Sequence, residues 1–175
     1  MAQFLANRNF LGMGHHKLIL DDDFKEEFSL VAVHCSEEDY KMAYLLNRHL
    51  DLGLKREAVD LDYSNQGLKA TFSLFQYTSD LLYTSYDLVT NKCKSTEQNV
   101  LGEGGLFSEE ASEKNITAYL LPEHKKVDFF LKIYSEFSTI PLRNIIATVN
   151  EIKQVISAYE VAPENIKSKN NLIFD

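Results

Sequence analysis

The stretch FSLVAVHC (residues 28–35), followed by SEEDYKMAYLLNRHLDLG (residues 36–53), decides the class of fold. The first run is continuously apolar, rich in β-branched and aromatic side chains and too short for a typical helix, so it predicts a strand buried on both faces. The second segment predicts a helix, with Ser36 as its N-cap, Asp39 as the acidic partner of a capping box and Gly53 beyond its end. The chain therefore combines strands with helices.

Further strands are predicted in the middle of the chain. From Arg56 to Tyr63, apolar and polar residues alternate, which is typical of a strand with one face in water. The runs ATFSLFQY (residues 70–77) and LLYTSYDLV (residues 81–89) are joined by a short polar turn and predict an antiparallel hairpin. ITAYLL (residues 116–121) is the fifth predicted strand.

Two more helices are predicted after residue 121. Pro122 would occupy the first helical position, where proline is favoured, and two apolar stripes follow at spacings of three and four residues. The residues 172–174 at the end of the chain are apolar and predict an edge strand that docks on the domain. The first stripe consists of Val127, Phe130, Leu131 and Tyr134, and the second begins near Pro141 with Leu142, Ile145, Val149, Ile152, Ile156 and Tyr159.

Together these patterns predict an α+β fold in which a mainly antiparallel sheet of about five strands is covered by about three helices. A chain of 175 residues can bury a sizeable core as one domain. We expect this domain at residues 15–175, preceded by a disordered leader at residues 1–14. Residues 91–115 are polar, contain glycine and lack apolar periodicity, so they predict a long loop.

Composition narrows the classes of partner. The formal net charge of −8 repels phosphate backbones and anionic lipids, which disfavours nucleic acid and membrane surfaces. The two cysteines, Cys35 and Cys93, lie far apart and lack metal-ligand spacing, a pattern typical of reduced thiols in a cytoplasmic protein. No apolar run reaches the roughly 20 residues that a membrane helix needs. We therefore expect a cytoplasmic protein without metal or other cofactor.

The segment LPEHKKVDFF (residues 121–130) concentrates charged side chains between two apolar runs. If it begins a helix, Glu123 points inward at the unsatisfied amides of the first turn, where an anion is stabilised by roughly 0.3–1 kcal/mol. His124, Asp128 and Lys132 would then form a ladder at spacings of four residues. This structural role explains the segment fully. The alternative is a catalytic grouping around His124 and Asp128, because histidine titrates near neutral pH.

The same segment resembles a family named for the pattern IPExxxVDY. Pro122, Glu123, Val127 and Asp128 match that pattern, whereas leucine stands at the isoleucine position and phenylalanine at the tyrosine position. The runs HKLILDDDF, HCSEEDYKMAYLLNRHL and KSKNNLIF are also similar to the family. The resemblance implies a small cytoplasmic bacterial protein, mainly of the Bacteroidetes, with no assigned activity, and it supplies no catalytic residue.

His34 and Cys35 offer the best enzymatic arrangement outside this motif. They end the first predicted strand directly before a helix N-terminus, where the helix dipole favours a thiolate or a bound anion. However, neighbouring residues on a strand point to opposite faces, and the following acidic residues raise the pKa of a thiol. A buried structural cysteine is the expected role.

Other acidic and glycine-bearing segments are expected to be solvated. The run Asp21 to Asp23 lacks the spaced ligands and the turn glycine of a calcium loop. Asp60 and Asp62 share one face of a predicted strand and could form a carboxylate pair, but two acids on a wet face are usually only hydrated. GEGGLF (residues 102–107) lacks the spacing of a phosphate-binding loop. No metal ligand or catalytic residue is assigned.

By elimination, the sequence favours a non-enzymatic adaptor or regulatory domain that binds a protein partner. Its candidate contact residues are His124, Lys125 and Lys126, together with the hairpin tyrosines Tyr77, Tyr83 and Tyr86. One alternative is an enzyme of unrecognised type that uses His34 with Cys35 or His124 with Asp128. A second is nucleic-acid binding, which requires Lys125, Lys126, Lys132 and Arg143 to converge on one face. The oligomeric state is left open.

Overall fold

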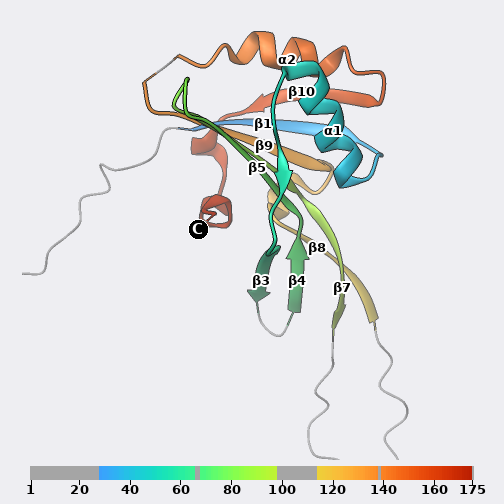
Figure 1. The fold of residues 1–175 in the computed structure, drawn as a ribbon. Coiled ribbons are helices and arrows are strands. Elements are labelled where there is room, and N and C mark those ends of the chain that lie inside the picture. Colours follow the sequence, from blue (N-terminus) through green and yellow to red (C-terminus); the bar gives the residue numbers. More distant parts are fainter. Residues whose placement is uncertain (1–27, 66–67, 98–113, 138, 175) are drawn as a thin grey trace, which may run out of the picture.

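The computed structural model describes residues 28–65, 68–97, 114–137 and 139–174 (Figure 1). Its main sheet contains β1 (Phe28–Cys35), β2 (Lys55–Arg56), β5 (Leu74–Ser79), β6 (Thr84–Thr90), β9 (Phe129–Ser135) and β10 (Val155–Val161). These six strands lie in the order β10–β1–β9–β6–β5–β2, and all neighbouring strands are antiparallel. The strand predicted at residues 28–35 is confirmed.

The remaining described elements are two small sheets and several helices. The sheets pair β3 (Leu61–Asn65) with β4 (Leu68–Phe72), and β7 (Lys92–Glu97) with β8 (Lys114–Tyr119). The helices are α1 (Asp39–Leu50), α2 (Leu142–Asn150) and three short 3-10 turns, η1 (Pro122–His124), η2 (Pro163–Asn165) and η3 (Lys169–Leu172). Neither α-helix of the described ranges has the length and apolarity to cross a membrane.

Both α-helices cover one face of the main sheet (Figure 1). Side chains alternate between the two faces of a strand, so Val31 and Val33 of β1 point to the helices. There they join Leu131 of β9, Met42 of α1 and Val149 of α2 in one core, and all five are buried. The helix predicted after residue 35 is confirmed as α1, and its buried apolar residues supply one side of this core.

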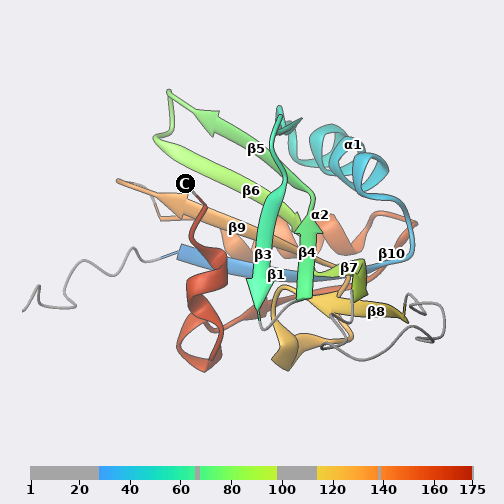
Figure 2. The same ribbon diagram turned by 90° about the horizontal axis from the view of Figure 1, so that it is seen from below.

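The two small sheets and the C-terminal segment cover the opposite face (Figure 2). Leu30 of β1 and Phe130 of β9 point to this face and pack beneath Phe72, Leu121 and Leu172. The central strands are thus buried on both faces, which accounts for their continuous apolar sequence.

A buried polar row crosses this second face. Lys132 of β9 lies opposite Asp87 of β6, and both side chains are buried. The Lys132 ammonium donates a hydrogen bond of 3.1 Å to the carbonyl of Leu172 and lies 5.3 and 5.1 Å from the ring centroids of Phe28 and Phe174. Leu172, at the end of η3, and Phe174 after it therefore dock on the domain over a buried lysine, and not as the predicted edge strand.

The prediction of a helix that begins at Pro122 is wrong. Only the single turn η1 is helical, and residues 129–135 form β9 between β1 and β6. Because this central strand is apolar on both faces, Phe130 and Leu131 match a helical stripe by coincidence. The second predicted helix also ends early, because apolar residues of the edge strand β10 happen to continue the helical spacing. α2 stops at Asn150, and Ile156 and Tyr159 belong to β10.

Other predicted boundaries shift. Residues 56–63 are not one strand, because β2 ends at Arg56 and β3 begins at Leu61. The hairpin is confirmed as β5 and β6, although residues 70–72 belong to β4. The capping box is absent, because Glu38 is the N-cap of α1 and the Asp39 carboxylate accepts bonds from Arg56 and Ser73.

The predicted loop at 91–115 is also corrected, since β7 and β8 occupy its described parts. Residues 92–97 of β7 pair with residues 114–119 of β8. The polar sequence of these residues does not by itself indicate this pairing. The described residues thus form a mixed α+β fold with a mainly antiparallel sheet, as predicted. The main sheet has six strands and the described residues form two α-helices, where about five strands and about three helices were expected. The predicted leader at residues 1–14 lies outside the described residues.

The outer edge of β10 is protected by a side chain. Asn150, the last residue of α2, accepts a 2.8 Å hydrogen bond from the Ala158 N–H and donates one of 2.9 Å to the Ala158 carbonyl. Its amide also donates to the carbonyl of Ile146. An uncovered edge strand is a template for pairing with another chain. Asn150 therefore occupies the backbone groups through which a second molecule would add.

We predict that Asn150→Ala promotes self-association of the chain, because it frees both backbone groups of Ala158 at the sheet edge. Sedimentation velocity at increasing protein concentration measures this effect. The matched control is Asn144→Ala, an exposed position on the same helix. Equal sedimentation of the two variants at every concentration would show that the Asn150 amide does not protect the edge.

Candidate functional site

The segment at residues 120–128 folds around one buried side chain, Asn91, which follows β6. The Asn91 Nδ2 donates to the carbonyls of His124 and Val127 at 2.9 and 3.0 Å, and its Oδ1 accepts from the Leu121 N–H at 2.8 Å. Its own N–H donates to the Asp128 carbonyl at 2.9 Å. An amide side chain thus satisfies backbone groups of an irregular loop that would otherwise be buried without partners.

Glu123 fastens the C-terminal segment to this loop. Its exposed carboxylate accepts hydrogen bonds from the backbone N–H and the hydroxyl of Ser168, at 2.9 and 3.1 Å. Partial burial alone would raise the pKa of this carboxyl, but the bonds from Ser168 and from nearby backbone amides outweigh it and lower the pKa. The inward position predicted for Glu123 is therefore wrong, because no helix continues beyond η1.

Asp128 joins the end of β1 to β7. Its Oδ2 accepts from the Cys35 N–H at 3.0 Å, and its Oδ1 pairs with the Lys92 ammonium at 2.6 Å. Val127, beside it, is buried in the core under the second face. The predicted ladder of His124, Asp128 and Lys132 does not form, because these residues lie on a turn and a strand and not on one helix.

Each motif residue therefore has a structural partner or place. Pro122 begins η1, Glu123 holds the C-terminal segment, Val127 fills the core and Asp128 links two strands. The His124 ring packs edge-on against Phe130 at 6.0 Å, away from the carboxylate partners of Asp128. The structure does not bring His124 and Asp128 together as a pair for proton transfer.

His34 and Cys35 are also kept apart. The Cys35 side chain lies in the core beneath the helices, whereas His34 stacks on Tyr159 at 5.7 Å, with 3.3 Å between its Nε2 and the tyrosine hydroxyl. Burial raises the pKa of the Cys35 thiol, and the charges of Glu37 and Asp128 raise it further. A backbone hydrogen bond and the charge of Lys41 act in the opposite direction but do not reverse the shift. The thiol therefore stays protonated at neutral pH, which makes it a poor nucleophile.

The basic residues considered for nucleic acid do not converge. The Lys125 ammonium lies 5.8 Å from the centre of the Tyr119 ring. Lys132 is buried beneath the C-terminal segment. Arg143 is exposed on α2, which covers one face of the sheet, whereas the loop that carries Lys125 packs on the other face. Lys126 is exposed beside Lys125, so only two neighbouring lysines remain of the predicted face.

The three hairpin tyrosines divide into two environments. Tyr77 and Tyr86 stack on each other at 6.1 Å and pack against the core beneath the helices. Burial raises the pKa of the Tyr86 hydroxyl, and the neighbouring Tyr77 adds to this. Tyr83 alone is mainly exposed, in the turn between β5 and β6. A single aromatic patch of all three residues, as predicted, is therefore not present.

An exposed apolar cluster does form at the tip of this hairpin. Leu81, Leu82 and Tyr83 of the turn are 87%, 54% and 58% exposed, and Phe137, just after β9, is 74% exposed. The rings of Tyr83 and Phe137 meet edge to face at 5.3 Å. We call these four residues the hairpin-tip cluster. Their contiguous exposure is unusual on a protein that has no partner there.

The backbone of the tip is strained and held in place. Tyr83 has a φ of 48°, in the left-handed region, which costs a residue with a side chain about 1–2 kcal/mol. Its carbonyl accepts a 3.1 Å bond from the Glu136 N–H, and the Thr84 hydroxyl donates to the Leu82 carbonyl at 2.9 Å. Strain of this kind at a bulky residue is often retained for a function.

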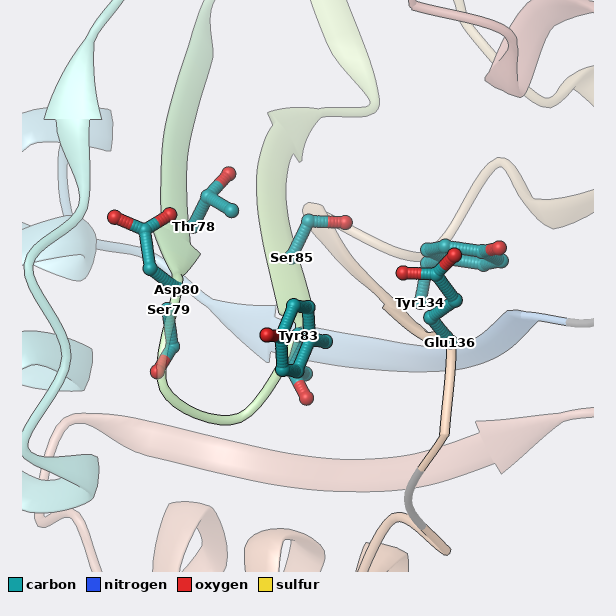
Figure 3. A pocket seen from close by; sticks show the side chains of 8 residues that line it. Thr78, Ser79, Asp80, Tyr83, Ser85, Tyr134 and Glu136 are labelled. Carbon is teal, nitrogen blue, oxygen red and sulfur yellow. The ribbon is translucent and has the colours of Figure 1, made fainter.

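A shallow pocket of about 390 Å³ lies beside the cluster (Figure 3). Its floor is the row Thr78, Ser85 and Tyr134, on the sheet face opposite the helices. Asp80 stands at the β5 side and Glu136 beside Tyr134 at the β9 side (Figure 3). Hydroxyl groups, two aromatic rings and two carboxylates thus line one open concavity.

Sequence reasoning missed most of this site. It assigned Leu81 and Leu82 to a strand, so their position in a turn was not seen, and it did not consider Phe137 or Glu136. The signal that could have indicated this turn was the pair of adjacent leucines directly after a polar segment. A strand with one face in water needs apolar residues only at alternate positions. The contact of Phe137 with Tyr83 joins residues far apart in the chain, and no local pattern encodes it.

The acidic segments of the sequence are only partly described by the structure. Within the described part of the chain, no group of three or more His, Cys, Asp or Glu residues is arranged to hold a metal ion. Asp60 pairs with Arg56, while Asp62 accepts from the Thr71 hydroxyl at 3.5 Å, so the two do not act as a carboxylate pair. Asp21 to Asp23 and residues 102–107 lie outside the described residues.

Comparison of the chain with protein-family models, curated proteins and solved structures gives no match.

We predict that Asn91→Ala lowers the free energy of unfolding by about 3 kcal/mol, because it leaves buried backbone groups of the loop without partners. Urea denaturation followed by circular dichroism measures the change. Lys126→Ala, an exposed change in the same loop, is the control and should stay within about 0.5 kcal/mol of the unchanged protein. A similarly small loss for Asn91→Ala would mean that water or rearranged backbone replaces the amide.

We also predict that iodoacetamide labels Cys93 before Cys35 in the folded protein at pH 7. Cys93 is partly exposed, whereas Cys35 is buried with a raised thiol pKa. Peptide mass spectrometry should show a difference on the order of 100-fold in rate, which disappears in urea. The Cys35 rate should rise only as the pH passes above the ordinary thiol range. Fast labelling of Cys35 in a Cys93→Ser variant at neutral pH would revive the enzymatic alternative.

Proposed function

We propose that the protein is a non-enzymatic, cytoplasmic protein-binding domain that acts as an adaptor or regulatory subunit. We further propose that it belongs to the IPExxxVDY family, on the resemblance of residues 121–129. The observation that carries the function is the hairpin-tip cluster, which exposes two leucines and two aromatic rings side by side. Aromatic residues beside aliphatic ones are the usual anchors of protein interfaces.

The construction of the tip supports this function. Hydrogen bonds from Glu136 and Thr84 hold the turn in one conformation before any partner arrives. A preformed surface loses little conformational entropy on binding, so more of the contact energy appears as affinity. The cluster also lies apart from the motif loop, whose side chains are committed to holding the fold.

The enzymatic and nucleic-acid alternatives have less support. Cys35 is buried with a protonated thiol, and His124 has no acidic partner among its described contacts. For nucleic acid, only Lys125 and Lys126 form a basic surface, on a chain whose net charge is −8. Neither alternative has a set of side chains arranged around one reacting or binding group.

Affinity capture tests the proposed function. The tagged full chain is used to capture proteins from an extract of the cells that naturally make it. The double variant Leu81→Ser with Phe137→Ser should capture at most about one tenth as much of any stoichiometric partner as the unchanged chain, because it lacks two apolar anchors.

The matched control is Tyr40→Ser with Tyr44→Ser, which changes two exposed aromatic residues on α1. This control should capture as much partner as the unchanged chain. Loss of the partner in the control alone would move the interface to α1. Absence of any stoichiometric protein from all captures would contradict the adaptor function. Circular dichroism confirms that each variant is folded.

A further inference from the structure

The pocket beside the hairpin-tip cluster indicates what kind of partner binds there. Among its lining residues, the charged ones are Asp80 and Glu136, and both are acidic. In the described ranges, the ion pairs of acidic residues involve Glu37, Asp39, Asp60 and Asp128, so Asp80 and Glu136 have no basic partner there. Both carboxylates remain available to an incoming cation.

The shape of the pocket suits a cationic side chain. Figure 3 shows the two carboxylates at opposite sides of the concavity, with the ring of Tyr83 between them and the ring of Tyr134 beside Glu136. A guanidinium or ammonium group is attracted by the face of an aromatic ring as well as by carboxylates. The hydroxyls of Thr78 and Ser85 add hydrogen-bond acceptors on the floor.

The neighbouring apolar surface requires more than an isolated cation. Leu81 follows the pocket residue Asp80 in the chain, and Phe137 contacts the pocket residue Tyr83. Both side chains are exposed and would stay in water if only a cationic head group bound. A purely apolar partner would instead cover Asp80 and Glu136 and bury their charges without compensation, which is costly. A segment that carries a basic residue next to apolar residues satisfies both parts of the surface.

We infer that the hairpin tip and its pocket bind a basic, apolar-flanked peptide segment of a partner protein. This inference rests on the proposed protein-binding function and specifies its ligand. An arginine or lysine of the segment enters the pocket between Asp80 and Glu136. Its leucine or aromatic neighbours cover the hairpin-tip cluster. The acidic character of the whole chain, with a net charge of −8, further favours a basic partner and steers its approach.

Selection from a phage library of random dodecapeptides on the immobilised full chain tests this inference. The selected sequences should be enriched in arginine or lysine beside leucine or aromatic residues. A fluorescein-labelled synthetic copy of the most enriched sequence is then titrated in fluorescence anisotropy. Its affinity should fall by about tenfold or more with Asp80→Asn and Glu136→Gln together, and also as salt rises from roughly 0.05 to roughly 0.5 M.

The matched control is Glu151→Gln with Glu164→Gln, which also removes two negative charges, but from exposed positions away from the pocket. It should leave the affinity within about twofold. Enriched peptides without basic residues, or peptides that bind equally to the Asp80 and Glu136 variant, would overturn the inference about the ligand. The proposed function would survive that result if Leu81→Ser with Phe137→Ser still abolished binding. If no peptide is enriched, or if none depends on the tip residues, both proposals fail.

Discussion

The buried amide of Asn91 is the interaction on which the second layer of this protein depends. The loop at residues 120–128 must leave β8, make one helical turn and enter β9 in the centre of the main sheet. Irregular backbone in such a place is costly unless its polar groups are paired. A single side chain pairs with three of them, and its neighbours extend the arrangement through the Asp128 ion pair and the Glu123 bonds to Ser168. The loop thereby becomes part of the core.

This arrangement gives each residue of the motif a structural role. Its acidic residues hold strands and a chain segment together, and its apolar residue fills the core. The surface left for binding is elsewhere, at the end of the sheet where Thr78, Ser85 and Tyr134 face solvent beside the hairpin tip.

The two faces of the sheet are covered by different means, and this difference places the proposed binding site. Helices α1 and α2 cover one face with amphipathic stripes. Short sheets and the C-terminal segment cover the other, and the segment is anchored on the buried Lys132. The part of this sheet face beyond Lys132 is not covered by these elements. It forms the floor of the acidic pocket, next to the apolar side chains of the strained turn at Tyr83.

The sequence by itself determined the buried strand at residues 28–35, the helix after it, the β5–β6 pairing and the mixed class of fold, because these depend on local periodicity and turn residues. Only the tertiary structure decided that residues 129–135 and 155–161 are strands. The apolar run of β9, which is covered on both faces, and the buried residues of β10, which are spaced three apart, also fit a helical stripe. It also decided the roles of Asn91 and Phe137, whose partners lie far away in the chain. Long-range packing brings such residues together, and the spacing of residues along the chain does not predict these contacts.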